Sequence, residues 1–178
     1  MDHEDLLVSE RIREVTVMCG REQAIYEQIS CFGIALYVLG FFEGDDIMSI
    51  EDVENDEAAI ILAENFTEIK KEELPFGYHI ANSEERFLVV IGELLFPKHF
   101  AVLVDTEAKK PFFSKMRYFG SGYDSLDEIM SGFLGEDGLS YEDIHYFRLN
   151  RKEARVIPFR SKIYIVKDDG ESVVCGYN

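Results

Sequence analysis

The sequence of 178 residues predicts an α+β fold, in which N-terminal helices pack on a mostly antiparallel sheet built from a central and a C-terminal hairpin. Helical periodicity is confined mainly to the first forty residues, and two pairs of short apolar runs are separated by turn signals. Helices and strands do not alternate regularly, as they would in a parallel sheet. We expect a single domain over residues 1–178, with a weak possible boundary in the acidic segment 43–57.

The first elements are two predicted helices. Apolar residues recur at helical spacing over 4–18, and Gly20 is expected to end this helix. A second helix is predicted from about Glu22 to Leu39, and residues 32–42 are apolar nearly all round, which predicts burial on most sides.

The composition then changes to an acidic stretch at 43–57, where Ser49 and Asp52 form a variant of the capping box. A short helix is expected to begin there. Residues 58–63 form an apolar run of ambiguous type, and the Leu-Pro-Phe-Gly sequence at 74–77 is a turn signal.

The centre of the chain predicts a buried antiparallel hairpin. Its strands are residues 86–95 and 99–106, both rich in Val, Leu, Ile and Phe, with residues 96–98 as the tight connection. Residues 115–119 are a candidate third strand.

Two capping signals and a second hairpin signal follow. Ser125 and Glu128 form a capping box, which predicts a helix to about Leu134, and residues 140–143 predict a short helical turn. Residues 162–167 and 172–177 flank an Asp-Asp-Gly-Glu turn, which predicts the C-terminal hairpin.

The charge of the chain departs most from the average. Asp and Glu total 35 against 18 Lys and Arg, giving a formal net charge of −17. Such a field repels nucleic-acid phosphates and anionic membranes, so we expect no direct nucleic-acid binding and no membrane binding. The basic run of Arg148, Arg151, Lys152 and Arg155 is short and is expected to be solvated. The same field attracts a basic protein partner, although acidity that only maintains solubility is the alternative.

The cysteines and the first residues indicate the compartment. Three cysteines without a C-x-x-C pair, and a start without a basic and apolar leader, predict a cytoplasmic protein with free thiols. Cys31 is expected to be a buried, inert thiol, and Cys175 lies in a predicted strand.

One short motif indicates ligand binding. Arg117, Gly120, Ser121 and Gly122 precede the capped helix at Ser125, and two glycines before a helix N-terminus are typical of an anion cradle. This R-x-x-G-x-G pattern resembles the acyl-CoA pyrophosphate loop of the GNAT acetyltransferases. The resemblance implies an acyl-CoA-dependent acyltransferase in which backbone amides hold the pyrophosphate. The alternative is a plain strand–turn–helix connection, which the acidic residues of the first helical turn favour.

Other motifs for chemistry are weak. His3, His79, His99 and His145 form no metal-binding pattern, and no EF-hand spacing occurs, so we expect no metal and no resident cofactor. A cation site in the segment 43–57 is an open alternative.

The aromatic residues of the centre have two interpretations. They are expected to belong mainly to the core, although exposed aromatics beside carboxylates would suit a protein interface. The preferred hypothesis is a non-enzymatic interaction or regulatory module that docks a basic partner, and the acyltransferase is the alternative.

Overall fold

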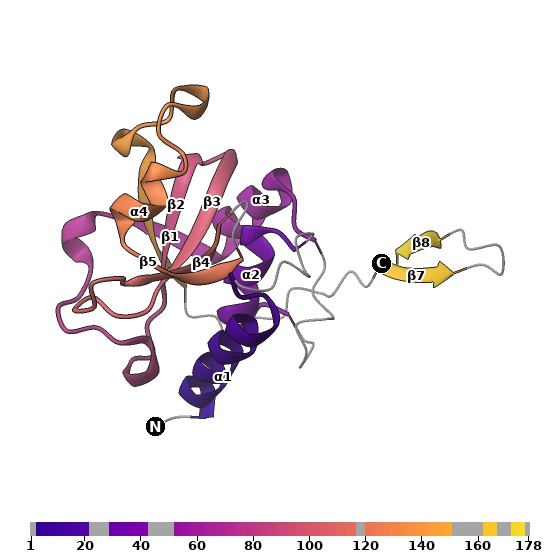
Figure 1. The fold of residues 1–178 in the computed structure, drawn as a ribbon, viewed down its shortest axis with the longest axis horizontal. Coiled ribbons are helices and arrows are strands. Elements are labelled where there is room, and N and C mark those ends of the chain that lie inside the picture. The colour runs from indigo at the N-terminus through magenta and orange to yellow at the C-terminus, as the bar shows by residue number, and fades with distance from the viewer. Residues whose placement is uncertain are drawn as a thin grey trace.

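The computed structural model describes residues 3–21, 29–42, 52–116 and 120–150, together with two strands at 162–166 and 172–176 (Figure 1). The α-helices are α1 (His3–Met18), α2 (Cys31–Val38), α3 (Asn55–Asn65) and α4 (Leu126–Ser131). The short 3-10 helices are η3 (Lys71–Glu73), η4 (Ile80–Asn82), η5 (Glu136–Gly138) and η6 (Tyr141–Asp143). The strands are β1 (Phe66–Ile69), β2 (Phe87–Glu93), β3 (Phe96–Leu103), β4 (Phe112–Lys115), β5 (Ser121–Asp124), β6 (Ile144–Leu149), β7 (Lys162–Val166) and β8 (Ser172–Gly176).

Six of the strands form one antiparallel sheet in the order β1-β6-β2-β3-β4-β5. The predicted α+β class, with helices first and an antiparallel sheet after them, is therefore confirmed. The C-terminal hairpin also forms, because β7 pairs with β8. It makes a two-stranded sheet of its own instead of joining the larger one.

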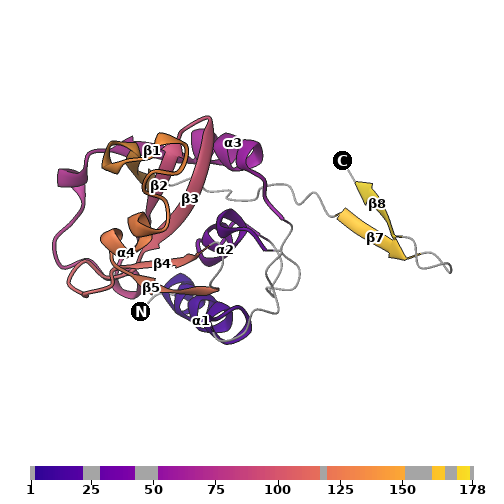
Figure 2. The same cartoon turned by 45° about the horizontal axis from the view of Figure 1, so that its top comes forward.

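Both faces of the six-stranded sheet are covered. Neighbouring residues of a strand point to opposite faces, and in β3 these neighbours have different partners. Phe100 meets Phe32 of α2 edge to face, with ring centroids 4.8 Å apart. His99 lies 5.1 Å from the ring of Phe133, which follows α4. Helices α2 and α3 thus cover one face, and α4 with the short helices after it covers the other (Figure 2).

The central hairpin forms as predicted, but its connection is placed differently. The tight turn lies at Leu94 and Leu95, because Glu93 pairs with Phe96, so the expected connection at 96–98 is wrong. Pro97 belongs to β3, where a bulge shifts the register next to Gly92. A proline beside a bulge is tolerated because the ladder is already interrupted there.

The first helix forms as predicted, but the second does not extend unbroken from Glu22 to Leu39, because Ile29 and Ser30 are not helical. Helix α1 ends at Met18, and α2 begins at Cys31 after Ser30, whose hydroxyl accepts from the Gly33 amide. The expected start near Glu22 lies in residues 22–28, outside the described part. The ambiguous run at 58–63 is helical, as part of α3, while the capping box at Ser49 lies in the undescribed residues 43–51.

Three strands, β1, β5 and β6, were not predicted from the sequence. The candidate strand at 115–119 overlaps β4 only at Lys115, and residues 117–119 lie outside the described part. β1 and β6 have neither long apolar runs nor strict alternation, because each carries charged or half-buried residues at several positions. They pair with each other, and β6 also pairs with β2. Pairing with neighbouring strands, rather than their own pattern, explains why they form. β6 lies beside the strongly apolar β2, and β1 lies beside β6.

Candidate interaction surface

The residues of the predicted acyl-CoA loop belong to a strand. Ser121 and Gly122 begin β5, and Gly120 directly precedes it, while Arg117 lies outside the described residues. The Ser121 amide donates to the Cys19 carbonyl at 2.7 Å, so this amide is directed to protein. The capping box at Ser125 forms as predicted, but the helix behind it has only six residues. Binding of acyl-CoA stays a prediction.

The two glycines of this motif permit a close approach between segments. Neither has a positive φ. A Cβ on Gly120 would lie 2.5 Å from the Gly20 carbonyl oxygen, and one on Gly122 would lie 2.9 Å from Nε of Arg21. Arg21 in turn forms an ion pair with the buried Asp124. These glycines therefore allow the chain after α1 to lie against β5.

His79, His99 and His145 each make contacts within the fold. His79 accepts from the Ala81 amide through Nδ1 and caps η4, and His145 lies 3.4 Å from the Glu68 carboxylate. His99 is 1% exposed and packs on Phe133. No group of three or more His, Cys, Asp or Glu that could hold a metal ion occurs within the described ranges.

Cys31 as a residue is half-buried rather than fully buried as predicted, although its thiol is covered by protein. Its thiol donates to the Lys98 carbonyl at 3.8 Å, and burial raises its pKa to about 11. Burial also raises the pKa of Cys19, whose side chain is enclosed. Thiols with raised pKa values are poor nucleophiles at neutral pH. Cys175 lies in β8, and its side chain is outside the described set.

The aromatic residues of the centre include both buried and exposed side chains, the two classes considered from the sequence. Tyr78, Phe112, Phe113, Tyr146 and Phe147 belong to the core. Phe76, Tyr123 and Tyr141 are exposed.

One end of the sheet collects exposed apolar and acidic side chains from three separate segments. These are the turn between β2 and β3, the loop from α4 to η5, and η6 with the start of β6. The β strands bring them together, because Ile91 near the end of β2 pairs with Ile144 at the start of β6. Lys98 at the start of β3 forms an ion pair of 3.3 Å with Asp137 of η5. We call this region the apex surface and define it by Glu93, Leu95, Phe96, Leu134, Asp137 and Glu142.

The apolar members of the apex surface are unusually exposed for their type. Leu95 is 87% exposed, and Phe96 and Leu134 are each 49% exposed. A two-residue hairpin turn is ordinarily formed by Asn, Gly or Asp, so a Leu-Leu pair there is not explained by turn chemistry. Figure 1 shows the ends of β2 and β3 beside the orange segment that follows α4.

The backbone under the apex surface is held by several contacts. Gly92 has φ +108 beside the bulge, where Lys98 is the extra residue, and Lys98 is thereby turned toward Asp137. The Asn55 amide donates to the Pro97 carbonyl at 2.6 Å, which ties α3 to the start of β3.

The charge of this end is strongly one-sided. Residues 87–97 and 134–143 contain five acidic residues and no Lys, Arg or His. Lys98 supplies a positive charge, and its ammonium lies 5.2 Å from the Phe96 ring centroid as well as next to Asp137. The Tyr141 hydroxyl donates to Asp127 at 2.7 Å, and this hydrogen bond raises the pKa of Tyr141. The surface therefore presents apolar side chains within a negative rim.

The sequence leaves a cation site in the acidic segment 43–57 open as an alternative, and only residues 52–57 of this segment are described. Sequence reasoning did not select the apex surface, because the segments of that surface are far apart in the chain. The one available signal was the pair of leucines at a turn.

Comparisons with protein-family models, curated proteins and solved structures found no match to this chain. Among the described helices, none combines the length and apolar character needed to cross a membrane.

Proposed function

We propose that this protein is a non-enzymatic interaction or regulatory module that docks a basic protein partner through the apex surface. The observation that carries the proposal is the group of five carboxylates at one end of the sheet, which lie within residues 87–97 and 134–143, two ranges without a basic residue. Electrostatic complementarity of this kind raises the rate of association and selects the sign of the partner.

The exposure of the carboxylates supports docking of a partner better than neutralisation of these carboxylates by basic residues of the same chain. Asp137 remains 67% exposed in spite of its ion pair with Lys98, and Glu93 and Glu142 are exposed. Exposed ion pairs of this kind contribute little to stability. The carboxylates are therefore available to cationic side chains of a partner.

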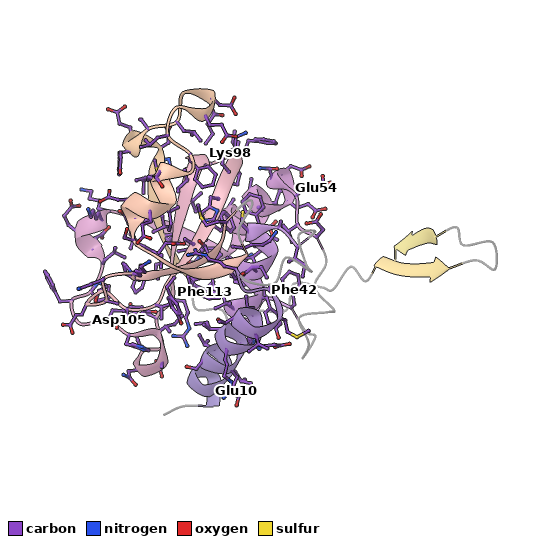
Figure 3. All side chains as sticks on the ribbon, in the orientation of Figure 1. Glu10, Phe42, Glu54, Lys98, Asp105 and Phe113 are labelled. Carbon is purple, nitrogen blue, oxygen red and sulfur yellow. The ribbon has the colours of Figure 1, made fainter. Side chains whose placement is uncertain are left out.

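The proposal is tested with a fluorescein-labelled peptide of alternating lysine and serine, whose binding is followed by fluorescence anisotropy at low and moderate salt. We expect E93K/E142K to weaken binding about tenfold, since two attractive charges become repulsive. The matched control is E10K/E107K, which changes the net charge by the same amount. Figure 3 labels Lys98 near the apex surface and Glu10 and Asp105 at the opposite end of the molecule.

Two results would contradict the proposal. One is the absence of binding to the wild-type protein at low salt. The other is an equal loss in both double variants, because net charge alone would then account for the attraction.

The acyltransferase remains the alternative, and a separate measurement addresses it. Thermal unfolding with acetyl-CoA at about one hundred times its dissociation constant would stabilise a binding protein by roughly 2.7 kcal/mol. We expect no shift, because the Ser121 amide is already paired with Cys19. A clear shift that Gly122→Val removes would favour the enzyme.

A further inference from the structure

We propose that the occupant of the apex surface is an amphipathic basic segment of a protein partner. Its apolar side chains cover Leu95, Phe96 and Leu134, and its flanking Lys or Arg side chains meet Glu93, Asp137 and Glu142. This inference rests on the proposed function and specifies the chemistry of the partner.

The first step of the argument is the exposure of the apolar side chains. Leu95 is 87% exposed at the tip of a hairpin, where a polar residue would serve the turn equally well. Phe96 and Leu134 lie on the two segments that the Lys98–Asp137 ion pair joins. Apolar side chains grouped within a polar rim are typical of protein-binding sites.

The second step is the rigidity of the surface before binding. The bulge at Gly92, the Asn55–Pro97 hydrogen bond and the contact of His99 with Phe133 fix the two segments on the sheet. A surface that is already ordered loses less conformational freedom when a partner binds.

The third step is the choice of occupant by charge. A second copy of the chain in a two-fold interface would place this surface against itself and bring its carboxylates together. Anionic membranes and nucleic acids would be repelled by the negative rim. A segment that carries apolar residues between cationic ones satisfies both components of the surface.

The test compares two labelled synthetic peptides with equal numbers of lysines, one alternating with leucine and the other with serine. Their affinities for the full chain are measured by fluorescence anisotropy. The wild-type protein is expected to bind the leucine peptide about tenfold more tightly than the serine peptide. The variant L95S/L134S is expected to lose this difference and to keep its affinity for the serine peptide.

The matched control is I60S, which removes an exposed isoleucine of α3 (57% exposed) that is not a member of the apex surface. It should leave both affinities unchanged. Circular dichroism and the thermal midpoint verify that each variant is folded, as expected for side chains with this exposure.

The outcomes separate the two proposals. If the serine peptide binds but L95S/L134S has no effect on the leucine peptide, this inference is wrong and the proposed function stands. If the serine peptide does not bind the wild-type protein, the proposed function itself fails. Sedimentation velocity gives a further decision, because dimers that L95S abolishes would show that a second copy is the occupant and would overturn the inference.

Discussion

The two ends of the central β2–β3 hairpin are constructed differently. At one end, Arg86 directly precedes β2, is 3% exposed, and donates to the carbonyls of Ile80, Ser83 and Glu85. At the other end, the turn exposes Leu95 almost fully. The first end uses its polar groups internally, and the second presents apolar groups to solvent. The polar groups beside Arg86 therefore support the stability of the hairpin, whereas the exposed side chains at the turn are available for binding. We call the end at Arg86 the closed end and the end at the β2–β3 turn the open end.

The closed end is strengthened by a network of backbone pairing. The Tyr78 hydroxyl donates to the Glu85 carbonyl at 2.7 Å, and the Ile80 amide donates to Val104 at 2.8 Å. The loop before β2 is thereby attached to the end of β3. Removing Arg86 should therefore affect the whole loop.

The largest expected effect is that of Arg86→Ala. Three carbonyls lose a charged donor in a buried place, so we expect the free energy of unfolding to fall by about 3 kcal/mol. Urea unfolding measures this loss. Arg86→Lys retains the charge with a different donor geometry, so its free energy of unfolding should lie between those of the wild-type protein and the alanine variant. A loss below about 1 kcal/mol for the alanine variant would show that the closed end does not depend on this side chain.

The second effect concerns the bulge that supports the open end. Gly92 has φ +108, and a Cβ there would lie 3.0 Å from the Lys98 amide nitrogen. We expect Gly92→Ala to lower the free energy of unfolding by about 2 kcal/mol, through backbone strain and crowding together.

Gly135 provides the control for this substitution. It has φ +81, but a Cβ there would meet nothing within 4 Å. Gly135→Ala should therefore show the strain alone, about 1 kcal/mol. Equal losses at the two positions would contradict the crowding at the bulge.

The third effect is a pH dependence beneath the apex surface. The pKa of Cys31 is raised from 9.0 to about 11 by burial of its thiol, so the unfolded chain ionises first as pH rises. The stabilisation of the neutral thiol is fully present below pH 9 and is lost as pH rises through the folded pKa of about 11. At about pH 10 the loss is about 1.4 kcal/mol.

The comparison with Cys31→Ala isolates this contribution from that of the other residues that titrate in the same range. Unfolding of both proteins is measured between neutral pH and about pH 10. The wild-type protein should lose more stability over this interval than the alanine variant. Parallel curves would show that the thiol is not shielded from water.

Part of this architecture could be predicted from the sequence. Helix α1, the central hairpin and the caps at Ser125 and Ser140 have local signals, namely helical spacing, apolar runs and capping residues, and all of them form. The position of the β2–β3 turn was missed because Leu94 and Leu95 lack turn chemistry, while Pro97 has it.

The candidate site was less accessible to sequence reasoning for a physical reason. Its members become neighbours only through pairing of β2 with β6 and through the Lys98–Asp137 ion pair, which are long-range contacts. The glycine motif, by contrast, was visible, but Gly120 and Gly122 serve the approach of the segment after α1. A glycine in the sequence can indicate a position without room for a side chain, but it does not indicate which segment occupies that space.

The smallest expected effect on stability is that of Leu95→Ser. This substitution tests whether the turn end of the hairpin serves binding rather than folding. Because this side chain is 87% exposed, its removal should change the free energy of unfolding by less than about 0.5 kcal/mol. The same substitution should weaken binding of the leucine-containing basic peptide, measured by anisotropy on the same preparation. A substantial loss of stability would mean that Leu95 packs within the fold and that the two ends are built alike. Lost affinity with unchanged stability would show that Leu95 contributes to binding and not to folding.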